Sequence, residues 1–145
     1  MGRRIGWKLR DKAAYLGFAQ SNIARMANCS CAAKAAFCAL AAAVLALFHQ
    51  EGPDLPWACP AVVAAMAAAF SAFDSGYLQL ERRYRVLYRI IDEDRAGNYP
   101  TDMLPPAPSV VDGTRRRDAY LSWSVAGFYS VTAAICVAAS LLLGM

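Results

Sequence analysis

The chain contains three long uncharged stretches, at residues 35–50, 55–73 and 119–145, and all fifteen Lys and Arg lie outside them. About 20 mostly apolar residues are needed to cross the roughly 30 Å hydrocarbon core of a bilayer. The second and third stretches are long enough. The first becomes long enough if it starts near Ala32 and Lys34 reaches back to the headgroups. The pattern predicts an all-α membrane protein with three transmembrane helices.

The positions of the basic residues predict the orientation of these spans. Lys and Arg gather in residues 3–34, 82–95 and 115–117, whereas the short connection at 51–54 carries acids and no base. Because cytoplasmic flanks are enriched in Lys and Arg, we expect a cytoplasmic N-terminus and an outside C-terminus. The net charge of +4 fits flanks that meet anionic lipid, and no specific nucleic-acid partner is predicted. A soluble bundle is the alternative, but it would scatter its charges along each helix.

Proline and glycine predict where the helices end. No Pro interrupts residues 3–50, which favours one long helix running from the cytoplasm into the first span. Gly52, Pro53 and Pro56 then form a turn, and such a short connection makes the first two spans an antiparallel hairpin with cytoplasmic helical extensions. The single membrane domain, 1–145, is expected to comprise a cytoplasmic helix (1–31), span 1 (32–50), an outer loop (51–55), span 2 (56–74), a cytoplasmic helix (75–95), a cytoplasmic linker (96–118) and span 3 (119–144).

The hairpin register predicts two ion pairs. Residues equally far from the turn lie at equal depth, which places Lys34 beside Asp74 at the membrane boundary and Arg25 beside Glu81 about two turns below it. A carboxylate at a bilayer edge needs a partner. We therefore predict both contacts, within one chain or between neighbouring chains; four independently solvated side chains are the alternative. Arg85, four residues after Glu81, also has the spacing of a helical ion pair.

Small residues recur at every fourth position of each span, which lets helix backbones approach closely in lipid. These packing faces are Ala35, Ala39 and Ala43; Ala61, Ala65 and Ala69; and Ala126, Ser130, Ala134 and Ala138. Three thin spans bury little surface alone, so we expect a homo-oligomer. An alanine-biased composition without this role is the alternative.

The sequence carries no catalytic set. His49 is the sole histidine and is expected on the outer side, opposite every Arg, so it cannot join a Ser/His/Asp or Cys/His arrangement there. The five cysteines have neither disulfide-framework nor metal-ligand spacing. We expect a protein that is not an enzyme and holds no cofactor or metal. His49 and Glu51 are placed at an outer mouth, where a ring of Glu51 would tune cation passage in an oligomer; a solvated interfacial His is the alternative.

Two stretches have a distinctive spacing. They read Tyr15-Leu16-x-Phe18-x-Gln20-x-x-Ile23-x-Arg25-Met26-Ala27-Asn28-x-Ser30-x-x-x-Lys34 and Asp74-x-x-Tyr77-Leu78-x-x-Glu81-Arg82-x-x-Arg85-x-Leu87-Tyr88. This pattern resembles a family of small bacterial inner-membrane proteins, which we associate with RipA-type octameric membrane proteins and with small membrane accessories of CRISPR and other phage-defence systems. The resemblance implies a ring-like homo-oligomer, an octamer in the RipA type, that perturbs the membrane when a cytoplasmic partner signals infection or stress. Phe37 departs from the family, where an aromatic-rich Gly-Trp entry follows Lys34.

Two functions are therefore expected. The first is a non-enzymatic oligomeric effector of the bacterial inner membrane, pore-forming or membrane-depolarising, in phage defence or a stress response. The second is a passive membrane scaffold or accessory subunit that recruits a cytoplasmic partner through residues 82–95 and the N-terminal helix. A small-solute transporter is disfavoured, because the spans carry almost no polar residues at mid-depth, only Ser71 and the Ser and Thr residues of the third span.

Overall fold

The computed structural model describes residues 2–51, 58–93, 104–108 and 113–142, with the side chains of these segments except residues 2–10 and 51. The described chain is helical and has no strand. Its elements are α1 (Gly2–Glu51), α2 (Ala58–Glu93), α3 (Arg116–Tyr120), the π-helical turn η1 (Trp123–Gly127) and α4 (Phe128–Leu142).

Three helical segments are long and apolar enough to cross a membrane: Asp11–Gln50, Ala58–Glu93 and Trp123–Leu142. This confirms the predicted all-helical class and its three apolar helices. Proline placement explains the first two helices: α1 has no Pro, and Pro60 lies in the first turn of α2, where a missing N–H costs little. The predicted turn after α1 falls in residues 52–57, outside the described segments.

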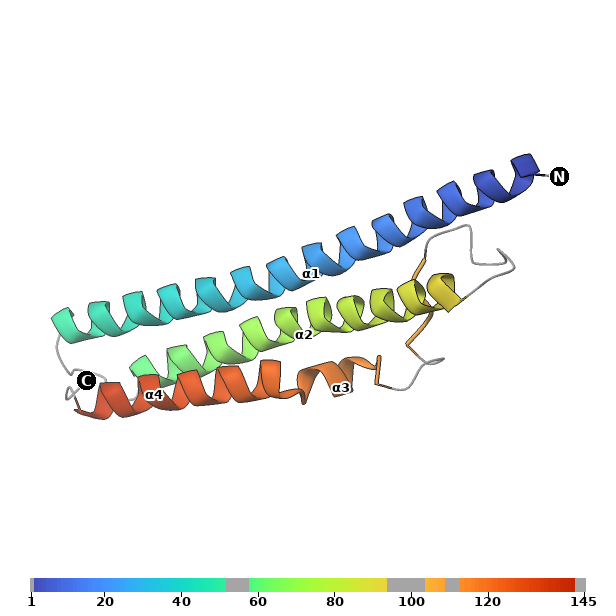
Figure 1. The fold of residues 1–145 in the computed structure, drawn as a ribbon. Helices are drawn as coiled ribbons and strands as arrows, with labels where there is room; N and C mark the ends of the chain where they lie inside the picture. The colour runs from blue at the N-terminus through green and yellow to red at the C-terminus, as the bar shows by residue number, and fades with distance from the viewer. Residues whose placement is uncertain (1, 52–57, 94–103, 109–112, 143–145) are drawn as a thin grey trace.

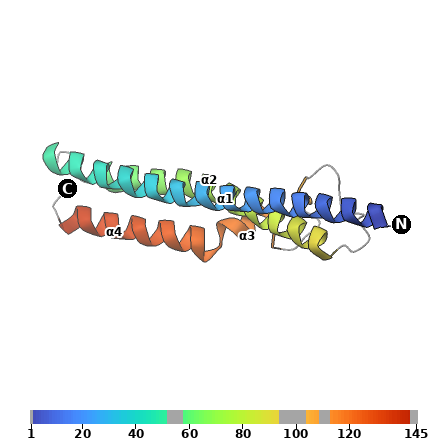
Figure 2. The ribbon, with the colours of Figure 1, turned by 45° about the horizontal axis from the view of Figure 1, so that its top comes forward.

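Helices α1 and α2 lie side by side and run in opposite directions (Figures 1 and 2). Near the start of α1, the Lys12 ammonium donates to the Asp92 carbonyl at 2.6 Å, and further along α1 Lys34 reaches Asp74. Helix α4 lies beside the first part of α2, so α1 and α2 continue together beyond the three-helix region (Figure 1). At about 1.5 Å per residue, the 50 residues of α1 extend about 75 Å, more than twice the thickness of a hydrocarbon core.

The core of the three-helix region is built around Phe37. This α1 side chain is fully buried against Ala67 of α2, Val125 of η1 and Tyr129 of α4. Its ring centroid is 5.1 Å from that of Tyr129 in an edge-on arrangement, a favoured geometry for aromatic pairs. A second cluster joins Ala41, Val63 and Cys136 closer to the far end of α4.

The third apolar stretch is not one continuous helix. The sequence predicts a single span from residue 119, but α3 ends at Tyr120, Ser122 adopts an extended backbone, and η1 begins at Trp123. Gly127 lets the Trp123 ring lie against the helix at this turn: a Cβ added there would lie 2.8 Å from the ring, so the ring would have to move. π turns of this kind frequently mark functional positions in helices.

The described parts of the linker, residues 104–108 and 113–115, are irregular and docked along α2. The Arg83 guanidinium donates to the carbonyls of Pro105 and Pro106 at 3.1 and 2.8 Å. Arg82 donates to the Gly113 carbonyl at 3.2 Å, and Gly113 has the positive φ of 78° that favours glycine. These bonds hold the linker against the second half of α2.

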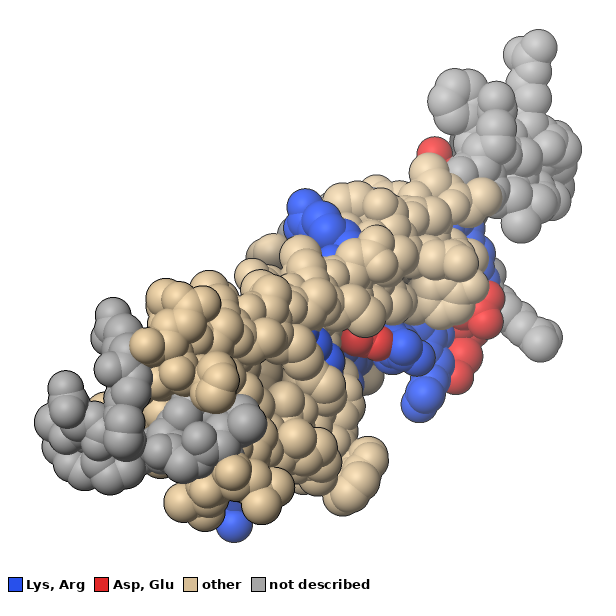
Figure 3. All heavy atoms as spheres, turned by 90° about the vertical axis from the view of Figure 1, so that its left-hand side faces the viewer, with Lys and Arg blue, Asp and Glu red and all other residues tan. Residues whose placement is uncertain are grey.

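Charged side chains are segregated along the molecule. In the space-filling view, the near end consists mostly of uncharged residues, and most Lys, Arg, Asp and Glu atoms lie further back (Figure 3). The near end contains the last turns of α1 and α4 and the start of α2 (Figure 1). The fold therefore has an apolar three-helix region and a charged two-helix extension, which we call the stalk: the described residues of α1 before Ser30 and of α2 after Asp74.

Candidate functional site

A buried ion pair joins α1 and α2 where the stalk meets the three-helix region. The Lys34 ammonium lies 2.5 Å from Oδ2 of Asp74, whose side chain is completely buried. The Ser30 hydroxyl donates to Oδ1 of Asp74 at 2.5 Å and accepts a bond from Lys34 at 2.7 Å. Ser30 and Lys34 are four residues apart and share one face of α1, so both reach the carboxylate. The contact predicted between Lys34 and Asp74 is present within one chain.

The second predicted contact, between Arg25 and Glu81, is not formed within the described chain. Glu81 accepts two bonds from Arg85, at 2.6 and 2.9 Å, as the helical spacing of these residues indicates. Arg25 is exposed and donates to the Asn22 side-chain oxygen at 3.1 Å. Hairpin register fixes the depth of a residue but not its direction around the helix, and the Arg25 side chain is bonded within α1 instead of across to α2. A contact between Arg25 and Glu81 of neighbouring chains stays a prediction.

Helix α3 is attached to α2 close to the ion pair. The Arg116 guanidinium donates to the Ala72 carbonyl at 3.1 Å. The Ser71 and Tyr120 hydroxyl oxygens are 3.2 Å apart, and Tyr120 donates, because the Ser71 proton is directed to the Ala68 carbonyl. The Arg116 and Tyr120 side chains thus attach α3 to the turn of α2 that precedes Asp74.

The Tyr129 hydroxyl is a further buried polar group in the three-helix region. Tyr129 is 3% exposed, and its hydroxyl is a buried oxygen with no hydrogen-bond partner in the described part of the chain. An unpaired buried hydroxyl costs roughly 1–3 kcal/mol, so this position is one where a bridging water would be stabilising. Tyr129 packs beside Phe37, one turn of α1 from Lys34.

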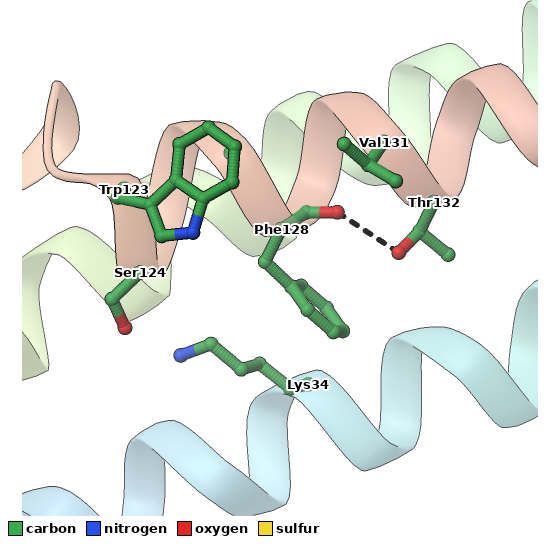
Figure 4. Close-up of a pocket in the computed structure, with 7 residues that line it drawn as sticks. Lys34, Trp123, Ser124, Phe128, Val131 and Thr132 are labelled. Atoms are coloured by element: carbon green, nitrogen blue, oxygen red, sulfur yellow. Dashed lines mark hydrogen bonds between the residues drawn. The ribbon is translucent and has the colours of Figure 1, made fainter.

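A groove of about 380 Å³ opens between α1 and the η1–α4 segment, and Lys34 contributes to it as well as to the ion pair. Its walls are mainly apolar, and Lys34 is the one titratable side chain among the described residues that line it. Figure 4 shows the ammonium of Lys34 below Ser124 and Trp123, with the Phe128 ring beside it; nitrogen and ring centroid are 5.9 Å apart. The lining residues are Lys34, Trp123, Ser124, Gly127, Phe128, Val131 and Thr132.

Most positions of the predicted small-residue faces point away from the core, whereas Ala126 and Ser130 line a groove beside α2. Ala39 follows buried Phe37 by two positions, Ala65 precedes buried Ala67 by two, and Ala134 precedes buried Cys136 by two. Two residues turn about 200° around a helix, so each alanine lies on the side opposite the core. The remaining face positions Ala35, Ala43, Ala61, Ala69, Ser130 and Ala138 are also exposed, and Ala126 is half-buried.

Among the described residues, no further polar cluster lies at the end of α1 that contains His49. His49 is exposed in the last turn of α1, and the Glu51 side chain is outside those described. All five cysteines are free, and no three His, Cys, Asp or Glu of the described residues lie close enough together to hold a metal ion.

Comparison with known protein families, with curated proteins and with solved structures gives no match. The resemblance to small bacterial inner-membrane proteins therefore stays a prediction, and the residues themselves carry the functional argument.

Sequence reasoning missed three residues of this site. Ser30 lies four positions before Lys34, and that spacing is a signal that could have indicated a second donor for Asp74. Trp123 could have been recognised as an aromatic residue at a span boundary. Tyr129 left no signal in the sequence, because its burial depends on how α4 packs against Phe37.

Proposed function

We propose that the chain is a multi-pass protein of the bacterial inner membrane that crosses the bilayer three times. The first two spans form a hairpin, the stalk and N-terminus lie in the cytoplasm, and the C-terminus lies outside. The segregation of charge supports this topology: Lys34 and α3, with Arg115, Arg116 and Arg117, mark one boundary, and the apolar three-helix region extends from it in one direction (Figure 1).

The protein functions as a homo-oligomer. Only 11%, 33% and 22% of the most apolar windows of the three membrane-length helices is buried within the chain. The observation that carries the proposal is the direction of the small-residue faces: Ala39, Ala65 and Ala134 all lie opposite the core and present small side chains outward. Such faces allow close backbone contact with another chain in lipid, where packing rather than hydrophobicity drives helix association.

The oligomer acts as a non-enzymatic effector that depolarises or permeabilises the membrane in phage defence or a stress response. The stalk receives the signal, and the Lys34–Asp74 pair transmits its movement to the spans. This role for the pair is supported by its place at the stalk–span junction and by the burial of Asp74, which ties α1 and α2 into one unit there.

The proposal is tested by expressing the protein in bacteria, recording membrane potential and dye exclusion, and imaging the detergent-solubilised particles. We expect a closed ring with a central hole and a loss of potential when the protein is triggered or overexpressed. Monomeric particles together with unchanged potential and dye exclusion would contradict it. A vesicle efflux assay on the purified protein separates direct permeabilisation from an indirect effect on the cell.

The stalk favours one alternative, a passive scaffold that recruits a cytoplasmic partner. In this region Arg85 and Arg89 are exposed on α2, and α1 and α2 project beyond α4 (Figure 1). A scaffold predicts co-purification of a defined soluble protein through the stalk, abolished by changes at Arg85 and Arg89, with no change in permeability. The effector predicts a change in permeability whether or not such a partner is present.

A further inference from the structure

We propose that the groove between α1 and the η1–α4 segment is a binding site for an anionic phospholipid. The phosphate would be held at Lys34, Ser124 and Trp123, and an acyl chain would lie along Phe128, Val131 and Thr132. The inference rests on the membrane insertion proposed above and adds a specific lipid to it.

The mouth of the groove has an excess of hydrogen-bond donors over acceptors: the Lys34 ammonium and the Trp123 indole only donate, and the Ser124 hydroxyl can both donate and accept. An ammonium has three N–H groups, and Lys34 directs one to Asp74 and one to Ser30. The Ser124 hydroxyl and the Trp123 indole N–H have no hydrogen-bond acceptor within the segments that the structure describes. Figure 4 shows the Ser124 hydroxyl turned toward the Lys34 ammonium and the nitrogen edge of the Trp123 indole facing the same side. A phosphate diester, which only accepts hydrogen bonds, complements this set.

The rest of the groove suits an acyl chain. The Phe128 ring and the Val131 side chain form its wall, and the Thr132 hydroxyl is already bonded to the Phe128 carbonyl at 2.9 Å. Thr132 can therefore present its methyl group. A ligand with an anionic head and an apolar tail matches both ends of the groove.

The basic residues that precede η1 favour an anionic over a zwitterionic lipid at this boundary. Lys34 is balanced by Asp74, but α3 and its preceding residue carry Arg115, Arg116 and Arg117 against the single acid Asp118, all of them exposed. Arg116 and Arg117 line a separate groove against α2, so they would raise the local concentration of anionic lipid and leave the contact in the groove to Lys34, Ser124 and Trp123. Basic clusters at a cytoplasmic boundary attract anionic lipid headgroups.

The π turn positions the indole for this role. Trp123 is 83% exposed, yet its ring lies against Gly127, where an added Cβ would be 2.8 Å away. A Gly127→Ala substitution therefore displaces the ring from the groove without changing any charge. Gly17→Ala is the matched control, because a Cβ at Gly17 meets nothing within 4 Å.

The test uses the full chain with Trp7→Phe and Trp57→Phe, so that Trp123 is the only tryptophan. The protein is reconstituted in phosphatidylcholine vesicles containing a small fraction of dibrominated phosphatidylglycerol or, in parallel, dibrominated phosphatidylcholine, and quenching of Trp123 fluorescence is measured. We expect about tenfold preferential association of the anionic lipid, which corresponds to about 1.4 kcal/mol. Ser124→Ala and Gly127→Ala should lower the ratio of anionic to zwitterionic lipid association toward one, and Gly17→Ala should leave this ratio unchanged.

Equal quenching by the two lipids, or a preference that survives both Ser124→Ala and Gly127→Ala, would overturn the site. A Trp123→Phe/Ile135→Trp variant of the same background reports insertion separately, because Ile135 is exposed on α4 one turn beyond Val131 and does not line the groove. If that reporter is not quenched in vesicles of brominated phosphatidylcholine alone, membrane insertion fails and the proposed function fails with it. If the Ile135→Trp reporter is quenched while Trp123, in the protein that retains it, is quenched by neither lipid, another chain fills the groove. That result refutes the lipid site alone.

Discussion

The Lys34 ammonium and the Asp74 carboxylate are 2.5 Å apart across the interface of α1 and α2, and no part of the Asp74 side chain is exposed. Ser30 supplies the second donor to the same carboxylate. The pair lies where the charged stalk meets the apolar helices. We therefore expect removal of the pair to lower the stability of the protein and to weaken its assembly into oligomers.

Removing only the cation should be the most damaging change at this site. Lys34→Met leaves the Asp74 carboxylate buried without its ion partner and should destabilise the protein by about 3–5 kcal/mol. Lys34→Met combined with Asp74→Asn removes both charges and should recover most of that loss. Temperature-dependent loss of the monodisperse peak of the detergent-solubilised protein in size-exclusion chromatography measures both. A double variant no more stable than Lys34→Met would show that the charges do not act as a pair.

The hydroxyl of Ser30 should contribute measurably to the same site. Ser30→Ala removes the hydrogen bond to Oδ1 of the buried carboxylate and should cost about 1–3 kcal/mol. Ser21→Ala, at an exposed position of the same helix, is the matched control and should have little effect. The same thermal assay compares them; equal stability of the two variants would contradict the role given to Ser30.

The docking of the linker should depend on Arg83. Arg83→Ala removes the donors to Pro105 and Pro106 and should free the backbone beside them. Arg89→Ala, at an exposed position further along α2, serves as the control. A nitroxide spin label on Ala107→Cys, an exposed position of the segment, in a background with the other cysteines changed to Ser, should become more mobile in the EPR spectrum for Arg83→Ala alone. Unchanged mobility would mean that other contacts hold this segment.

Bulk on an outward small-residue face should weaken assembly. Ala39→Leu adds a branched side chain opposite Phe37 without touching the core, so the oligomer should shift toward smaller species while the monomer fold is kept. Cys38→Leu adds comparable bulk at the same depth on an exposed flank of the helix and is the control. Native mass spectrometry of the two variants gives the distribution of subunit numbers; identical distributions would exclude this face from the interface.

The proposed orientation predicts opposite labelling of the two ends. In a background with all five cysteines changed to Ser, a membrane-impermeant maleimide should label His49→Cys in intact cells and Arg89→Cys only after permeabilisation. Both positions are exposed, so burial does not account for a difference. Labelling of Arg89→Cys in intact cells would show that the stalk lies outside the cell, which contradicts the proposed topology and a cytoplasmic signal received by the stalk.

The residues that the structure brings together show how far depth alone can predict contacts. Lys34 and Asp74 were matched by depth and do meet, whereas Arg25 and Glu81 were matched in the same way and do not. The depth of a residue can be calculated from the sequence, because each helical residue adds a constant rise and the residues can be counted from the turn. Direction around the helix follows from which side chains fill the interface, and that depends on the packing of α1 against α2.

The helical class, the three apolar helices and the uninterrupted course of α1 and α2 can be predicted from the sequence, because hydrophobic length, charge segregation and proline placement act locally along the chain. Two other features depend on how the helices pack. Packing of Trp123 on Gly127 accompanies a break where a continuous span was predicted, and packing of Phe37 on Tyr129 buried a hydroxyl that nothing in the sequence singled out. These contacts join residues distant in the chain or on adjacent turns, and their geometry exists only once the helices have packed.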